Sequence, residues 1–192
     1  MPQHKTRLDL YDNSWYAPGS FLKRTIWYIV NWIFFKSSFP YPQIIKIFLL
    51  KVFGAKIGRN SGFKPSVNIK YPWFLEIGDN VWIGEDVWID NLAPVRIGNN
   101  VCVSQGVYLL TGNHDYKKKT FDLIIGPITI EDGVWIGAKS IICPGITLKS
   151  HSVITAGSVM IKNSDPYTIY QGNPAVLLRK REMTEKSSSL SG

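Results

Sequence analysis

Residues 77–88 read IGDNVWIGEDVW, two successive units of six in which Ile is followed by Gly and the fifth position is Val. The same period runs from Ile57 to Asp165, where fifteen rows of six begin with an aliphatic residue or Phe. An α-helix would repeat its apolar residues every 3.6 positions, and a long strand would alternate every two. A unit of six instead indicates a very short strand followed by a tight corner, where Gly, Asn or Asp accommodates unusual backbone angles.

The breaks in the repeat give the number of rows in each turn. The spacing widens from six to eight residues after Ile69 and after Ile89, and to twenty-one residues after Leu109. Each break follows three rows, so three rows form one turn and the extra residues leave the coil at the same corner. The sequence therefore predicts an all-β solenoid of about five turns, which begin at Ile57, Ile77, Ile97, Ile130 and Leu148.

The composition excludes several classes of protein. With 192 residues, 45% of them hydrophobic and 19% charged, the chain can bury a core. The net charge of +8 is concentrated in residues 1–56, with 8 basic and 2 acidic residues, against 14 and 12 in the remainder. The main domain thus lacks the charge pattern of a nucleic-acid-binding protein. Two distant cysteines form no disulfide framework, and the N-terminus does not read as a signal peptide, so we expect a cytoplasmic protein.

Residues 21–53 form an apolar segment that precedes the repeats. Pro40 and Pro42 should divide it into two short helices. Its most apolar stretch, residues 25–35, reaches only about 16 Å as a helix, whereas a bilayer core of roughly 30 Å needs about twenty residues. We expect the segment to cap the open end of the first turn. Its lysines and aromatic residues leave open a second role, peripheral contact with the inner face of the membrane.

These patterns divide the chain into four parts. They are an N-terminal segment with a helical cap (1–56), the repeat domain (57–165) with a projecting loop (113–127), a C-terminal segment (166–182) and a tail (183–192) that lacks apolar residues and should be disordered.

The chain resembles the hexapeptide-repeat acyltransferases. The stretch IEDGVWIGAKSIICPGITLKSHSVITAGSVMIKNSDPYTIYQGNPA (130–175) is similar to the maltose, galactoside and nodulation O-acetyltransferase branch. YDNSWYAPG (11–19), WIDNLAPVRIG (88–98) and TGNHDY (111–116) look like the colanic-acid-type exopolysaccharide acetyltransferases. The resemblance implies a left-handed parallel β-helix, acetyl-CoA as co-substrate, and a homotrimer with active sites between neighbouring subunits.

His114 is the candidate catalytic residue. It stands where the third turn gives way to the projecting loop, and it matches the catalytic histidine of the family. A loop histidine is often only a surface residue, but an imidazole suits removal of a hydroxyl proton, a role that contributes typically 10²–10⁴-fold to the rate. No G-x-S-x-G elbow is present, residues 133–140 are one residue too short for a P-loop, and no metal site is expected.

The resemblance also implies residues that bind the two substrates. Lys180 or Arg181 should assist with the CoA phosphates, because Val176 stands where relatives carry a basic residue. For Asp12 and Asn13 a turn or helix cap is the alternative to acceptor binding. For Lys162 and Arg179 the alternative is an ordinary solvated charge. The residues expected to bind CoA are Trp135, Ala138, Ala156, Ile161, Lys162 and Arg179, and those expected to bind the acceptor are Asp90, Asn91, Asp12 and Asn13.

The sequence as a whole predicts an acetyl-CoA-dependent O-acetyltransferase that acts on a saccharide of exopolysaccharide biosynthesis, with the acceptor free or lipid-linked. Two alternatives stay open: acetylation of another small hydroxylated molecule, such as a free sugar or an antibiotic, and a non-catalytic β-helical scaffold.

Overall fold

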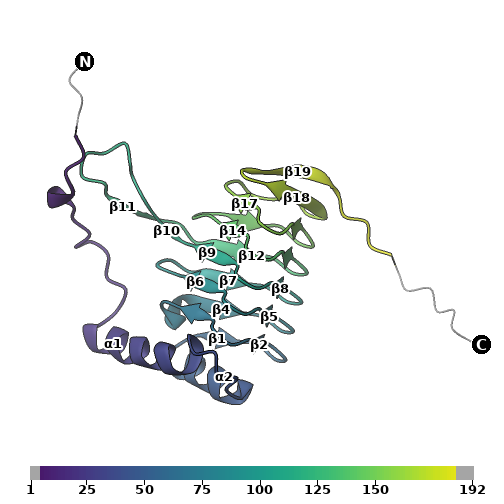
Figure 1. The fold of residues 1–192 in the computed structure, drawn as a ribbon, viewed down its shortest axis with the longest axis horizontal. Helices are drawn as coiled ribbons and strands as arrows, with labels where there is room; N and C mark the ends of the chain where they lie inside the picture. Colours follow the sequence, from purple (N-terminus) through teal and green to yellow (C-terminus); the bar gives the residue numbers. More distant parts are fainter. Residues whose placement is uncertain (1–4, 185–192) are drawn as a thin grey trace, which may run out of the picture.

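The computed structural model describes residues 5–184 and shows a triangular parallel β-helix with two helices packed against its first turn (Figure 1). The helices and helical turns are η1 (Leu8–Leu10), α1 (Phe21–Val30), the π-helix η2 (Asn31–Phe35), α2 (Gln43–Val52) and η3 (Pro72–Phe74).

Three sheets form the faces of the prism. The first face contains β1 (Lys56–Ile57), β4 (Leu75–Ile77), β7 (Val95–Ile97), β12 (Ile128–Ile130) and β15 (Thr147–Leu148). The second face contains β2 (Gly62–Phe63), β5 (Trp82–Ile83), β8 (Cys102–Val103), β13 (Trp135–Ile136), β16 (Val153–Ile154), β18 (Thr168–Gly172) and β19 (Ala175–Lys180). The third face contains β3 (Asn68–Ile69), β6 (Trp88–Asp90), β9 (Tyr108–Leu110), β14 (Ile141–Ile142) and β17 (Val159–Met160).

The aliphatic residue that begins each row points into the prism. On the third face Ile69, Ile89 and Leu109 are fully buried and pair in register with the strands above and below. The predicted solenoid, with three rows of six residues in each turn, is therefore confirmed. The count of about five turns needs a correction, because β18 stacks in parallel on β16 and adds a sixth coil to the second face. Tyr170, buried in β18, continues the inward column there.

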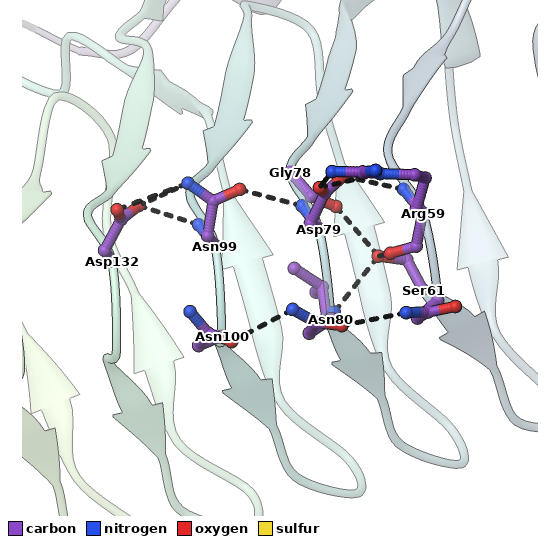
Figure 2. Close-up of polar contacts among 10 residues, drawn as sticks. Arg59, Ser61, Gly78, Asp79, Asn80, Asn99, Asn100 and Asp132 are labelled. Atoms are coloured by element: carbon purple, nitrogen blue, oxygen red, sulfur yellow. Dashed lines mark hydrogen bonds and ion pairs between the residues drawn. The ribbon is translucent and has the colours of Figure 1, made fainter.

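The corner between the first and second faces is held by polar ladders (Figure 2). Asp79 accepts from Arg59 N at 2.7 Å, and its own N–H donates to Asn99 Oδ1 at 2.9 Å. Beside this ladder, Asn80 links the side chains of Asn60 and Asn100 through hydrogen bonds of 3.2 Å. Each coil is thus bonded to the next by side chains as well as by strands.

The fourth position of a row adopts left-handed backbone angles. Gly, Asn and Asp tolerate these angles best, and they occupy most of these positions. The residues with positive φ at this position are Asn60, Ser66, Asn80, Asp86, Asn100, Gly106, Gly133, Lys139, Gly145, His151 and Gly157.

The N-terminal helices close the first turn, as the apolar pattern predicts. Trp27 is buried in α1 and its indole N–H donates to the Ile69 carbonyl at 2.8 Å. Lys46 of α2 is fully buried, and its Nζ donates to the carbonyls of Phe63 and Lys64 at 3.3 and 3.1 Å. Within residues 5–184, no helix has both the length and the apolar character to cross a bilayer.

The extra residues between rows leave the coil at one corner, between the third face and the first face of the next turn; this is called the third corner below. The longest excursion is a hairpin of β10 (Gly112–His114) and β11 (Leu123–Ile125), which projects beside the N-terminal segment (Figure 1). Arg7 N donates to the Lys119 carbonyl at 2.7 Å and ties that segment to the tip of the hairpin.

Candidate functional site

His114 ends strand β10, where the third coil gives way to the hairpin. Its half-buried imidazole stacks on the ring of Phe121, with 4.4 Å between centroids and 9° between planes. The ring of Tyr11 lies 5.7 Å away. The imidazole Nδ1 is 2.9 Å from the carbonyl oxygen of Phe121. Ring stacking and one hydrogen bond therefore fix the orientation of this side chain.

A cavity of about 360 Å³ opens beside His114 and is called the His114 cavity below. Its walls come from the N-terminal segment, the start of α1, the third corner and the hairpin. Tyr16 closes one side and donates its hydroxyl to the Leu92 carbonyl at 2.7 Å. Burial, with Tyr71 and Asp90 nearby, raises the pKa of Tyr16, so its hydroxyl stays protonated. The lining residues are Tyr11, Asn13, Tyr16, Pro18, Arg24, Lys70, Tyr71, Leu92, His114 and Leu123.

The two predicted acceptor residues near the N-terminus behave differently. Asn13 lines the His114 cavity. The exposed carboxylate of Asp12 accepts from the backbone N–H of Ser14 at 2.8 Å and from its hydroxyl at 3.1 Å, and these bonds lower its pKa. Asp12 therefore forms the turn that the sequence left open as an alternative, and it lies outside the lining of the cavity.

The other two predicted acceptor residues lie behind the cavity wall. Asn91 is fully buried and pairs with the backbone of Tyr71, accepting from its N–H at 2.9 Å and donating to its carbonyl at 2.6 Å. Asp90 is buried and lies 2.9 Å from Lys70 Nζ. Tyr108 donates its hydroxyl to Asp90 at 3.2 Å, and burial together with that carboxylate raises the pKa of Tyr108 to about 12. Both residues thus position groups of the third corner.

Two of the six residues expected to bind CoA, Trp135 and Arg179, lie on the second face. Trp135 points outward from β13 and donates its indole N–H to Ser104 Oγ at 3.0 Å. Trp135 pairs with Val153 of the next coil, and Val153 pairs with Ile169 of β18, so the three residues lie in one column on the outer side of the second face. Arg179 of β19 pairs with Ile169 at the end of this column. An exposed aromatic face and a cation thus share one side of the prism.

Ala138 and Ala156 occupy consecutive coils at the corner between the second and third faces. The carbonyl of Ala138 accepts from Gly157 N at 2.8 Å. Small side chains leave the backbone of this corner accessible, since Ala156 is exposed. Ile161 and Lys162 are also exposed but follow β17 at the third corner, away from the two alanines. The side chain of Arg181, named above as a phosphate-binding candidate, instead donates to the carbonyls of Gly133 and His151.

The structure therefore separates His114 from most of the residues expected to bind CoA within one chain. His114 follows the third face, whereas Trp135, Ala138 and Ala156 lie on the second face or at its far edge. The third face stands between them.

Several residues of the His114 cavity were not predicted from the sequence. Lys70 and Tyr71 begin the first eight-residue break, and they reach His114 because all breaks emerge at the third corner. Their position in a break of the repeat could have indicated that they lie at the same corner as His114. The repeat gives no information on Tyr11, Tyr16 or Arg24, because these residues precede it and only tertiary contacts bring the N-terminal segment to the hairpin. Across residues 5–184 no group of three or more His, Cys, Asp or Glu side chains is arranged to hold a metal ion.

Comparison with known proteins identifies the family. The family pattern "Hexapeptide repeat of succinyl-transferase" matches residues 75–111 and 127–161. The "Putative colanic acid biosynthesis acetyltransferase WcaF" of Escherichia coli K12 is 38% identical over 170 residues, which cover 87% of this chain and 92% of that protein. The galactoside O-acetyltransferase of the same organism is 33% identical over 149 residues, covering 76% and 73% of the two chains.

Solved structures agree with these relatives. A hexapeptide-repeat acetyltransferase of Vibrio cholerae complexed with acetyl coenzyme A is 27% identical, with a TM-score of 0.76 over 84% of this chain and 88% of that one. A galactoside acetyltransferase in complex with coenzyme A is 28% identical, with a TM-score of 0.75 over 84% and 82%. The fold, its repeat and these relatives together establish that this chain belongs to the hexapeptide-repeat acetyltransferases, enzymes built on a left-handed parallel β-helix.

Proposed function

We propose that the protein transfers an acetyl group from acetyl-CoA to a hydroxyl group of a saccharide used in exopolysaccharide biosynthesis. The observation that carries the proposal is the oriented imidazole of His114 at the edge of a cavity lined by tyrosines, Asn13 and two basic residues. Such a polar, aromatic wall suits a hydroxylated acceptor. The likeness to relatives named for colanic acid biosynthesis and for galactoside acetylation supports the class of acceptor.

The hydrogen bond of His114 selects the nitrogen that acts as the base. A carbonyl oxygen only accepts hydrogen bonds, so Nδ1, 2.9 Å from the Phe121 carbonyl, carries the proton. Nε2 is then unprotonated and free to take the proton of the acceptor hydroxyl. As the O–H bond breaks, the oxygen attacks the thioester carbonyl of acetyl-CoA. When the C–S bond breaks, the imidazolium returns the proton to the sulfur of CoA.

In this proposal acetyl-CoA binds along the second face and the corner that follows it. The outward indole of Trp135 and the open backbone at Ala138 and Ala156 fit the apolar and amide groups of a pantetheine arm. Arg179 supplies a cation for the phosphates farther along the same face. Because one chain keeps these residues apart from His114, we propose a homotrimer in which His114 of one subunit faces the CoA groove of its neighbour.

Substitution of His114 tests the proposal. In His114→Ala, release of free thiol from acetyl-CoA with a saccharide acceptor should fall at least about a hundredfold, because the general base is lost. Tyr116→Ala, in the same hairpin and 77% exposed, is the matched control and should retain normal turnover. The acceptor panel should include exopolysaccharide oligosaccharides, free sugars and hydroxylated antibiotics. Equal turnover by His114→Ala and the native protein would refute the role of His114.

We also propose that the helical cap rests on the inner surface of the cytoplasmic membrane. Leu22, Ile26, Ile29 and Ile33 recur at spacings of four, three and four residues and form an exposed apolar stripe. A second stripe on α2 contains Ile44, Phe48 and Val52. Between residues 13 and 75 the sequence contains nine Lys or Arg and no Asp or Glu. Each basic residue near an anionic membrane contributes about 1 kcal/mol of attraction.

Vesicle flotation tests the membrane proposal. The protein should float with phosphatidylglycerol-containing vesicles and less with pure phosphatidylcholine. A variant that combines Ile29→Ser, Trp32→Ser and Phe48→Ser should stay in the dense fraction, because all three side chains are exposed on the cap. Leu8→Ser removes an exposed apolar side chain outside the cap and serves as the control. If the native protein does not float, or if the triple variant floats equally well, the cap has no membrane role.

A further inference from the structure

A second cavity adjoins the His114 cavity along helix α1. It has a volume of about 420 Å³ and lies between α1 and the first coils of the third face. Arg24, Lys70 and Tyr71 line both cavities. The two cavities therefore share part of their walls and lie next to each other, and the second cavity is called the α1 groove here.

The α1 groove has a surplus of positive charge. Arg24, Lys36 and Lys70 line it, and none of its lining residues is Asp or Glu. Asp90 lies behind the wall, 2.9 Å from Lys70 Nζ, and compensates that one cation. Among the described residues, neither Arg24 nor Lys36 forms an ion pair. Two cations at the groove are thus left without a carboxylate partner.

Arg24 lies where the two cavities meet. Its Nε is shielded from solvent, yet no hydrogen-bond acceptor lies within reach of it among residues 5–184. A buried guanidinium nitrogen without an acceptor is costly unless a ligand supplies one. Phosphate and carboxylate oxygens are the acceptors that suit a guanidinium best.

Aromatic side chains along the α1 groove suit a sugar chain. Trp88 lies on the outer surface of the third face, stacked on Tyr108 with 4.7 Å between centroids and 12° between planes. Tyr28 lines the opposite wall, on α1. Flat, rigid aromatic rings offer apolar contact area to a polar ligand at low entropic cost.

We infer that the acceptor is an extended saccharide that carries an anionic group, either a phosphate or a uronate carboxylate, and that Arg24 and Lys36 bind this group in the α1 groove. The inference rests on the proposed function, because the hydroxyl that reacts must lie at His114. It adds that recognition of the acceptor extends past the reacting sugar to a charge held beside α1.

Binding of inorganic diphosphate tests the charge of the groove without turnover. Trp27 and Trp88 line the groove, so tryptophan fluorescence at low salt should report the titration. Arg24→Gln or Lys36→Gln should weaken binding about tenfold or more, because each removes a charge-assisted hydrogen bond. Arg96→Gln, on the first face, is the control and should bind as the native protein does. Absence of binding, or equal binding by all four proteins, would overturn the inference.

Matched acceptors test the same inference during catalysis. One oligosaccharide would be compared in three forms: neutral, with a reducing-end phosphate, and with a uronate in place of one neutral sugar. One of the anionic forms should have a kcat/KM about tenfold above the neutral form, and this preference should shrink in Arg24→Gln. The form that is preferred distinguishes phosphate from carboxylate. Equal kcat/KM for all three forms would overturn the inference while leaving the proposed function intact, whereas loss of the proposed function would appear as no thiol release with any acceptor.

Discussion

At the scale of single residues, the backbone angles and hydrogen bonds at the corners of the coil restrict which residue types fit there. Asn80 has a φ of 58°, donates to Asn100 Oδ1 and accepts from the side-chain amide of Asn60. Its side chain therefore performs two tasks: it tolerates a left-handed backbone, and it bonds three successive coils (Figure 2).

Two substitutions of Asn80 separate these tasks. Asn80→Gly keeps the backbone angle accessible and removes the two side-chain hydrogen bonds, at the added cost of a more flexible unfolded chain. Asn80→Val also places a β-branched residue in the left-handed region, so it should reduce the free energy of unfolding by about 1–2 kcal/mol more than Asn80→Gly does. Urea denaturation of the two variants measures the difference. Equal stability would show that backbone angle does not restrict this position.

The glycines of the repeat show what sequence reasoning misses at this scale. The sequence predicts that corner glycines supply unusual backbone angles, and this is correct for the fourth position, as at Gly106. The Gly of each Ile-Gly pair has another role. A Cβ on Gly78 would lie 2.6 Å from Asn99 Oδ1 and 2.8 Å from Gly98 C, so the close approach of the next coil requires its absence. Contact between coils cannot be read from one row of six.

At the scale of elements, the β10–β11 hairpin positions His114, the proposed general base. The twenty-one-residue spacing predicts where this excursion leaves the coil. The pairing of Asn113 with Ile124, and the bond from Arg7 to Lys119, depend on tertiary contacts that no local pattern encodes. For the same reason the sequence predicts His114 and misses Phe121, which holds its ring.

Phe121 is a positioning residue, and its truncation tests how the hairpin acts. Phe121→Ala removes a stacked ring 4.4 Å from the imidazole, a contact worth about 0.5–1.5 kcal/mol. The kcat should therefore fall up to roughly tenfold, while the KM for acetyl-CoA stays the same. Phe121→Tyr keeps the stacking and should restore kcat. A rise in KM with unchanged kcat would instead place Phe121 in substrate binding.

At the scale of the whole molecule, the prism separates the proposed base from most of the residues proposed to bind CoA. The coil brings Ala138 and Ala156 together on one edge, and the third corner presents His114 on another. The sequence predicts both groups of residues, but their separation becomes visible only when the three faces are assembled. The proposed site therefore combines two chains, and three copies of the 21.7 kDa subunit would give a particle of about 65 kDa.

Mixing two inactive variants tests this arrangement directly. His114→Ala lacks the base, and Ala156→Trp fills the small-residue corner that is proposed to accept the pantetheine arm. If each site combines His114 of one subunit with the corner of its neighbour, randomly mixed trimers should regain about one quarter of the native activity, since that fraction of sites pairs two intact halves. The variants would be denatured and refolded together, and thiol release compared with that of each variant refolded alone. Sites built within a single chain would give no recovery, because every subunit would carry one defect.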